Sequence, residues 1–241
     1  MSTAGAIKTE QRSCSAVFSK QIKDSFSMHI IFTGSVAVGK TYVQNKVQEF
    51  LQLNNKNYTL YPEFIHEDPV GLKLLSMRFE NLISASTLQN YIIDKWFVVA
   101  EQQKNNISPI SLYERLPEEA VEVFSKLFVS EEELNVHRKR IAKVPLPKYK
   151  DMNSKNCLWI KFTNDVNSDK INDLLKTIAK YMYLYKYIVI EVLSKTAYEN
   201  FKKRSRKGEN YSFDDLMDLS NEYAKYTHTL IGKILPFTIS L

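Results

Sequence analysis

The sequence predicts an α/β protein in which five parallel strands form one sheet with helices on both faces. Short apolar runs of strand type alternate along the chain with helical patterns, as they do when helices connect parallel strands. A glycine-containing turn lies directly between the first such run and the first helical pattern. Because no repeat or linker divides the chain, we expect one domain over residues 28–241, preceded by a disordered tail over residues 1–27.

The predicted elements follow one another in a regular order. Val43, Val47, Phe50 and Leu51 are spaced for one buried helical face after the first strand. Two further helical stretches are expected between residues 71 and 103, and Pro117 is well placed to open another. A basic helix is expected at about 195–207, and another helix at 212–230. Strands are expected at residues 29–33, 58–61, 110–113, 187–193 and 235–241.

Residues 130–168 fit this alternation least well. They contain Pro145, Pro147 and a charged stretch, followed by the apolar run Leu158-Trp159-Ile160. We interpret this segment as an insertion into the domain.

The composition excludes several classes of protein. Of the 241 residues, 44% are hydrophobic and 25% are charged, which is ordinary for a globular protein. The two cysteines, Cys14 and Cys157, are too few for a disulfide scaffold or a four-cysteine zinc site. No apolar run reaches the ~20 residues needed to span a bilayer, so no membrane partner is expected. The net charge of +6 favours an acidic partner, such as a polyphosphate or a nucleic acid, without choosing between them.

The first 27 residues give a weak indication of location. They lack the apolar core of a secretory signal. Basic residues such as Lys8 and Arg12 are typical of mitochondrial addresses, but Glu10 and Asp24 argue against one. We therefore expect a cytoplasmic protein, with a mitochondrial location as the minor alternative.

The turn after the first strand matches the phosphate-binding pattern G-x-x-x-x-G-K-[ST] in full. Glycines let successive backbone N–H groups turn inward toward phosphate oxygens, and the following helix adds its positive N-terminus. The lysine can contact the β- and γ-phosphates, and the threonine hydroxyl can bind Mg²⁺. This P-loop pattern predicts binding of ATP with Mg²⁺. Its residues are Gly34, Ser35, Val36, Ala37, Val38, Gly39, Lys40 and Thr41.

Three further places carry groups suited to phosphoryl transfer. Glu63 follows the second predicted strand, and the pair Glu114-Arg115 follows the third. Ligands of parallel sheets bind beyond the carboxyl ends of the strands, so these groups are expected at one edge. Residues 202–207 hold five cations and precede Gly208, which suits a short basic lid. A guanine-reading N-K-x-D motif is absent from the sequence, which argues against a GTPase.

In this order, the features resemble the deoxyribonucleoside kinase family, which includes thymidine, deoxycytidine and deoxyguanosine kinases. The resemblance runs from about His29 to Tyr226, with a gap across residues 130–168. It implies in-line transfer of the γ-phosphoryl group of ATP to a nucleoside 5′-hydroxyl, with thymidine or another pyrimidine nucleoside expected as acceptor. It also implies a homodimer formed through helices that flank the sheet.

The resemblance assigns roles to residues that match the family's motifs. Glu63 is then the catalytic base, although the local order is Pro-Glu and not Glu-Pro. Gln89 reads the nucleobase. Glu114 and Arg115 match the first two positions of a [DE]-R-S triplet and contact the substrate, and Glu114 is also placed to help hold Mg²⁺. Lys40 and Arg115 act in catalysis. Arg204 and Arg206 of the lid clamp the phosphates, Glu209 contacts the sugar 3′-hydroxyl, and Phe79 stands near the position of a sugar-holding tyrosine.

The sequence also departs from the family. The phosphate loop lacks the usual Gly-Ser before Gly-Lys, Leu116 replaces the serine of the triplet, and a tryptophan expected just after the base-reading segment is absent. Two alternatives therefore stay open, a nucleoside monophosphate kinase such as thymidylate kinase and an inactive nucleotide-binding relative. Nucleic-acid binding through residues 202–207 is not expected, because no aromatic side chains are interleaved there.

Overall fold

The structure, a computed structural model, describes residues 27–63, 65, 68–163, 167–194, 197–204 and 210–241, with only the helical backbone at Arg204. The predicted tail, apart from Ser27, lies outside these residues. The strands are β1 (Met28–Thr33), β2 (Tyr58–Tyr61), β3 (Ile110–Glu114), β4 (Cys157–Phe162), β5 (Tyr187–Val192) and β6 (Phe237–Ser240). The helices are α2 (Lys40–Leu53), α3 (Pro69–Phe79), α4 (Ala85–Lys104), α5 (Pro117–Glu119), η2 (Ala120–Ser125), α6 (Lys126–Phe128), α7 (Glu131–Ile141), η3 (Tyr149–Asp151), α8 (Ser168–Tyr181), α9 (Ala197–Arg204) and α10 (Phe213–Ile234).

All six of these strands belong to one parallel sheet with the order β2-β3-β1-β5-β4-β6. The predicted α/β class and parallel pairing are confirmed, but the predicted count of five strands is wrong. The additional strand is β4, which pairs with β5 on one side and β6 on the other. It contains the apolar run Leu158-Trp159-Ile160, so part of the segment interpreted as an insertion lies within the sheet.

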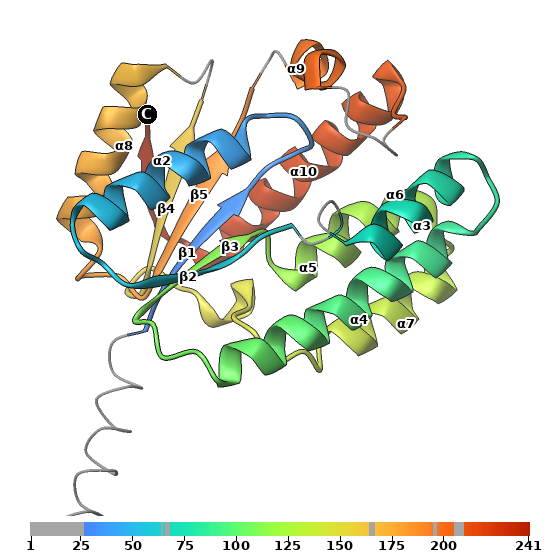
Figure 1. The fold of residues 1–241 in the computed structure, drawn as a ribbon, viewed down its shortest axis with the longest axis horizontal. Helices are drawn as coiled ribbons and strands as arrows, with labels where there is room; N and C mark the ends of the chain where they lie inside the picture. Colours follow the sequence, from blue (N-terminus) through green and yellow to red (C-terminus); the bar gives the residue numbers. More distant parts are fainter. Residues whose placement is uncertain (1–26, 64, 66–67, 164–166, 195–196, 205–209) are drawn as a thin grey trace, which may run out of the picture.

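Helices cover both faces of the sheet (Figure 1). Alternation along the strands sends neighbouring side chains to opposite faces. Ile30 of β1 packs in one core with Val43 and Val47 of α2 and with apolar residues of α8. Ile31 packs in the other core with Ile93 of α4 and with residues of α7 and α10. The apolar spacing predicted for α2 is thus confirmed.

The carboxyl ends of the central strands meet at one edge of the sheet. Phe32 lies opposite Glu114 in the β1–β3 pair, and Thr33 lies opposite Glu191 in the β1–β5 pair. The loop from β1 to α2 therefore begins where β3 and β5 end. The predicted strand-end groups lie at this edge.

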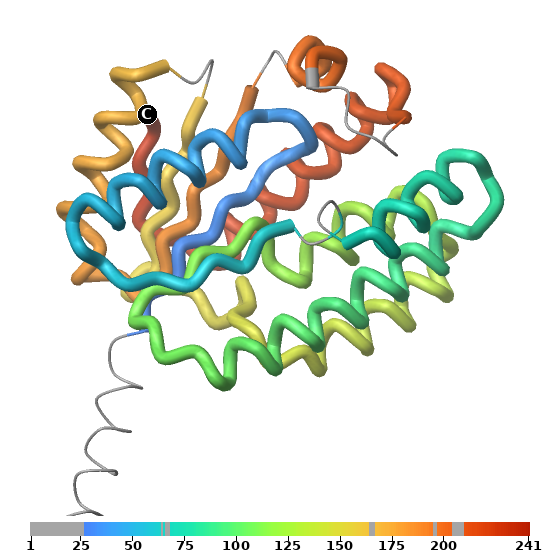
Figure 2. Tube along the Cα trace, in the orientation of Figure 1, coloured from blue at the N-terminus to red at the C-terminus, as the bar shows by residue number. Residues whose placement is uncertain are grey.

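Two segments flank this edge. One is a continuous helical segment, Pro117–Phe128, whose middle part, η2, has π-helical geometry. The other is α9, which Figure 2 shows close to the loop that joins β1 to α2. Of the basic helix predicted at about 195–207, the structure describes α9, Ala197–Arg204, and the remaining positions lie outside the described residues. Within the described ranges, no helix has both the length and the apolar character needed to cross a membrane.

Candidate functional site

Unusual backbone angles shape the loop of residues 34–41, which we call the glycine-rich loop. Gly34 has a φ of 135° and Gly39 a φ of 97°, values that side chains disfavour. A Cβ on Gly34 would also lie 2.3 Å from the carbonyl oxygen of Val192. Ala37 has a φ of 61°, so the loop curls in the left-handed region at a third position. Gly34 is therefore required both by its φ and by the closeness of β5.

Packing holds the glycine-rich loop in place. Val36 and Ala37 are buried in a cluster with Leu219 and Tyr223 of α10, and Val38 is buried in the core beneath α2. The hydroxyl of Ser220 donates a hydrogen bond to Ser35 at 3.1 Å. The apolar loop residues therefore anchor the loop with their side chains, which leaves their backbone N–H groups to contact a ligand.

Lys40 is buried at the start of α2. Its Nζ donates a hydrogen bond of 2.7 Å to the carbonyl oxygen of Ser35. Burial, reinforced by the nearby Arg115 cation, lowers the pKa of Lys40 to about 7. An anion that binds beside this lysine would stabilise its charged form and raise its pKa.

Arg115 links the glycine-rich loop to the ends of β2 and β3. Its guanidinium forms an ion pair with Glu63, and its Nε donates to the hydroxyl of Tyr223 at 2.7 Å. It also donates to the carbonyl oxygen of Gly34 at 3.4 Å and lies 5.1 Å from the centre of the Phe124 ring. Burial opposes its charge, but the attraction of Glu63 and other groups raises the pKa of Arg115 overall. The predicted proximity of Glu63, Arg115 and the loop is present.

Glu119 is a site residue that the sequence analysis missed. Its carboxylate is fully buried and accepts hydrogen bonds from Thr33 Oγ1 at 3.0 Å and from Tyr149 Oη at 2.8 Å. It also accepts from the backbone N–H of Leu116 at 3.1 Å. Burial raises the pKa of Glu119, and the Arg115 cation opposes that rise. The sequence did contain a signal for Glu119, which stands three residues after Leu116. From that position an acid commonly accepts a hydrogen bond from the backbone at the start of a helix.

The residues predicted to hold Mg²⁺ are Thr41 and Glu114. Thr41 is exposed in the first turn of α2, and Glu114 is buried at the end of β3. The Glu114 carboxylate is near enough to raise the pKa of Lys40. A hydroxyl and a carboxylate are oxygen ligands of the type that Mg²⁺ prefers, and the left-handed loop beside them suits a polyphosphate. The residues present therefore fit ATP with Mg²⁺.

Two of the residues predicted to contact the acceptor, Phe79 and Gln89, come from α3 and α4, whereas Glu114 and Arg115 are at the end of β3 and directly after it. Gln89 of α4 is buried, and among the described residues its Oε1 has no hydrogen-bond partner. Phe79, at the end of α3, packs edge-on against Tyr211, with ring centres 4.8 Å apart. Tyr211 in turn contacts Phe201 of α9. Phe79 therefore connects α3 with the segment around the predicted lid.

The predicted lid is described only in part. The side chain of Arg204 and all of Arg206 and Glu209 lie outside the described residues. Within α9, Asn200 Nδ2 donates to the carbonyl oxygen of Ala37 at 3.3 Å. This helix therefore contacts the glycine-rich loop at its left-handed residue.

Comparisons with known proteins add no assignment to this geometry. No protein-family model matches the chain, and a search of curated proteins found no significant match.

Proposed function

We propose that this protein is an ATP-dependent deoxynucleoside kinase that transfers the γ-phosphoryl group of ATP to the 5′-hydroxyl of a deoxynucleoside. The observation that carries the proposal is the Glu63–Arg115 ion pair, held beside the glycine-rich loop by the contact of Arg115 with Gly34. A carboxylate and a buried cation next to a phosphate-binding loop are the groups needed to deprotonate an alcohol and stabilise a transferring phosphoryl group.

In this proposal each charged residue has a separate task. Glu63 accepts the proton of the 5′-hydroxyl. A quarter of its side chain is exposed, which gives a hydroxyl access. Arg115 orients Glu63 and adds positive charge at the acceptor side, while Lys40 adds it at the phosphate side. Thr41 and Glu114 would hold Mg²⁺, which when bound offsets the charge of the β- and γ-phosphate oxygens.

The acceptor would lie between α4 and the end of α3. Gln89 favours a nucleobase at this position. Its buried amide oxygen has no hydrogen-bond partner among the described residues, which costs about 1–3 kcal/mol. A hydrogen bond from a base N–H would recover this free energy. An amide also donates and accepts together, which suits the edge of a pyrimidine. Phe79 would bound the sugar side. The proposal includes a homodimer, and Arg204, Arg206 and Glu209 as the phosphate and sugar contacts of the lid.

The acceptor decides between this proposal and its alternatives. Purified full-length protein would be incubated with Mg-ATP and, separately, with each of the four deoxynucleosides and with thymidylate, and the products resolved by chromatography. We expect a deoxynucleoside monophosphate, formed fastest from thymidine or deoxycytidine. Turnover of thymidylate alone would identify a monophosphate kinase. ATP binding without any product would identify an inactive relative, and either result would overturn the proposal.

A further inference from the structure

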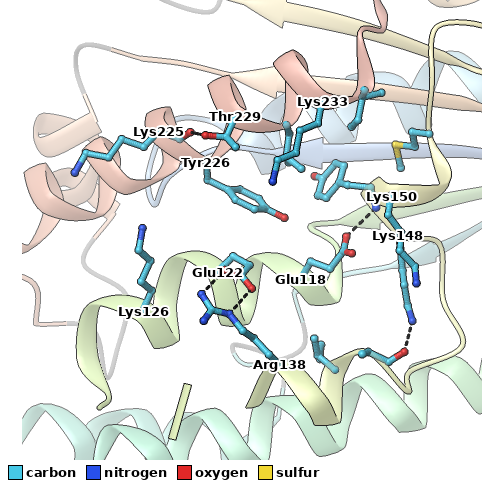
Figure 3. A pocket seen from close by; sticks show the side chains of 16 residues that line it. Glu118, Glu122, Lys126, Arg138, Lys148, Lys150, Lys225, Tyr226, Thr229 and Lys233 are labelled. Atoms are coloured by element: carbon cyan, nitrogen blue, oxygen red, sulfur yellow. Dashed lines mark hydrogen bonds and ion pairs between the residues drawn. The ribbon is translucent and has the colours of Figure 1, made fainter. Parts of the chain in front are cut away.

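A second charged hollow lies away from the glycine-rich loop. It has a volume of about 840 Å³ and lies between α10 on one side and the Pro117–Phe128 segment, the end of α7 and η3 on the other (Figure 3). We call it the basic groove. Its size is within the ~300–1,000 Å³ typical of small-molecule sites.

Cations outnumber acids in the basic groove. Six basic side chains line it and only two acidic ones, Glu118 and Glu122. Because α10, α7 and the η3 region all contribute, the charge comes from segments far apart in the sequence. The six basic residues are Lys126, Arg138, Lys148, Lys150, Lys225 and Lys233.

Most of these cations are already engaged. Arg138 donates two hydrogen bonds to Glu122, at 2.8 and 2.9 Å. Lys126 and Lys225 share Glu222, at 2.8 and 2.7 Å. Lys148 donates to the carbonyl oxygen of Ala142.

Two cations remain. Among the described residues, Lys150 and Lys233 have no hydrogen-bond or ion-pair partner, although both line the groove. Lys233 extends from α10 into the space between the two walls (Figure 3). Because neither charge is neutralised by a neighbouring acid among the described residues, both lysines offer positive charge to an anionic ligand in the groove.

The same groove also has an apolar and aromatic surface. Tyr226 of α10 points into it and packs edge-on against Tyr149, with ring centres 6.0 Å apart. Met152 and Ile234 line it as well. An aromatic ring and a thioether beside free cations suit a ligand that combines a flat ring with an anionic group.

We propose that the basic groove is a second ligand site, distinct from the glycine-rich loop, that binds a nucleoside monophosphate. Lys150 and Lys233 supply the positive charge that attracts the phosphate, and the base lies against Tyr226 beside Met152. The carboxylate of Glu118 is positioned to accept a hydrogen bond from the sugar or the base. The site does not depend on the function proposed for the glycine-rich loop.

The electrostatics of Glu118 agree with an anionic ligand. Burial raises its pKa to about 7, so part of its negative charge is absent at neutral pH. The backbone N–H of Tyr149 and the Lys148 cation oppose this rise, and Asp151 and Glu119 add to it. Tyr226 faces Glu118 from α10, where Lys225 and Lys233 are the cations that line the groove.

The methyl group of Met152 offers a local measurement of binding. The chain has six methionines, so a methyl spectrum of full-length protein labelled with [¹³C-methyl]methionine is simple, and Met152→Leu identifies the groove signal. The protein would be titrated with thymidine monophosphate, adenosine monophosphate, inorganic phosphate and a hexaglutamate peptide. We expect a saturable shift of the Met152 signal with the nucleoside monophosphates.

Charge reversal separates the groove from the rest of the surface. The double variant Lys150→Glu/Lys233→Glu should weaken binding about tenfold or more, and both residues are exposed, so the fold should persist. Lys139→Glu/Lys143→Glu is the matched control, because it makes the same charge change on exposed lysines that do not line the groove. It should bind as the unaltered protein does.

Several outcomes would overturn the proposal. One is a Met152 signal that stays fixed up to about millimolar nucleotide, the weak end of ordinary affinities. Equal weakening in the two double variants would show that general surface charge attracts the ligand. An equal response to inorganic phosphate would show that the groove does not recognise a base. A response to hexaglutamate alone would show that the groove binds an acidic protein segment.

Discussion

Two charged regions lie beside the same helical segment, Pro117–Phe128. They are the glycine-rich loop with its strand-end charges and the basic groove, and they differ in how deeply their charged side chains are buried. Glu119 faces the first site and Glu118 the second, one residue apart. In the first site Lys40 and Arg115 are buried and have fixed partners. In the groove the cations are largely exposed. The difference teaches that the loss of a single buried charge is costly to the fold, whereas an exposed charge can be replaced at little cost.

The largest difference should appear when one arginine of each region is replaced. Arg115→Met leaves Glu63 and Glu119 without their buried cation, and we expect a loss of about 3–5 kcal/mol in the free energy of unfolding. Arg138→Met, the matched control, breaks a half-exposed pair with Glu122 and should cost at most about 1 kcal/mol. Urea unfolding measures both. Equal losses would show that the Arg115 network is no more structural than the surface pair.

A glycine in each region gives the next largest contrast. Gly34→Ala adds a Cβ 2.3 Å from the carbonyl oxygen of Val192 at a positive φ, and should destabilise by about 1–3 kcal/mol. Gly232→Ala is the control, since Gly232 is in α10 beside Lys233 and a Cβ there would meet nothing within 4 Å. It should stabilise the protein by about 0.5–1 kcal/mol. Thermal unfolding measures both variants, and we expect the melting temperature to fall for Gly34→Ala and to rise for Gly232→Ala. Shifts of the same sign would contradict the comparison.

How much of this contrast the sequence could predict differs between the two regions. The motif and the strand-end rule predicted that Lys40, Glu63 and Arg115 would lie together. The basic groove had no such signal, because Lys150 and Lys233 are far apart in sequence and come to line one groove only through the packing of α10 near η3. Glu119 was missed because an acid near a helix start usually faces solvent, whereas here Thr33 and Tyr149 surround it.

Strand β4 was missed for a related reason. The apolar signal of Trp159 is short and stands next to a charged, proline-containing stretch, which favoured an insertion. Burial of this strand depends on partners distant in sequence, β5 and β6, and on the hydrogen bond of 2.8 Å from Trp159 Nε1 to Glu191. Periodicity within a single segment contains no information about such partners.

The smallest of the expected differences concerns protons. Lys40 has a pKa of about 7, so it is mostly charged at pH 6 and mostly neutral at pH 8. A bound phosphate favours the charged form and raises this pKa, so ATP binding should take up as much as about one proton at pH 8 and little at pH 6. The affinity for ATP should therefore fall as the pH rises above 7, by up to about tenfold per unit.

Calorimetry in two buffers of different ionisation enthalpy measures this uptake. Lys46, half-buried and paired with Glu49 on the same helix, provides the control: Lys46→Met should leave the uptake unchanged. Lys40→Met should abolish it. Uptake that persists in Lys40→Met would assign the proton to another group.

The most direct test of the central claim is the turnover number of Glu63→Gln with Mg-ATP and the preferred deoxynucleoside. Glutamine keeps the shape of the side chain and can still accept a hydrogen bond from Arg115, but it cannot take the proton of the 5′-hydroxyl. We expect kcat to fall about 10²–10⁴-fold with a KM close to that of the unaltered protein. Glu49→Gln, which replaces an exposed paired glutamate, should leave kcat unchanged. An unchanged kcat in Glu63→Gln would contradict the account, because the strand-end carboxylate would then not be the base.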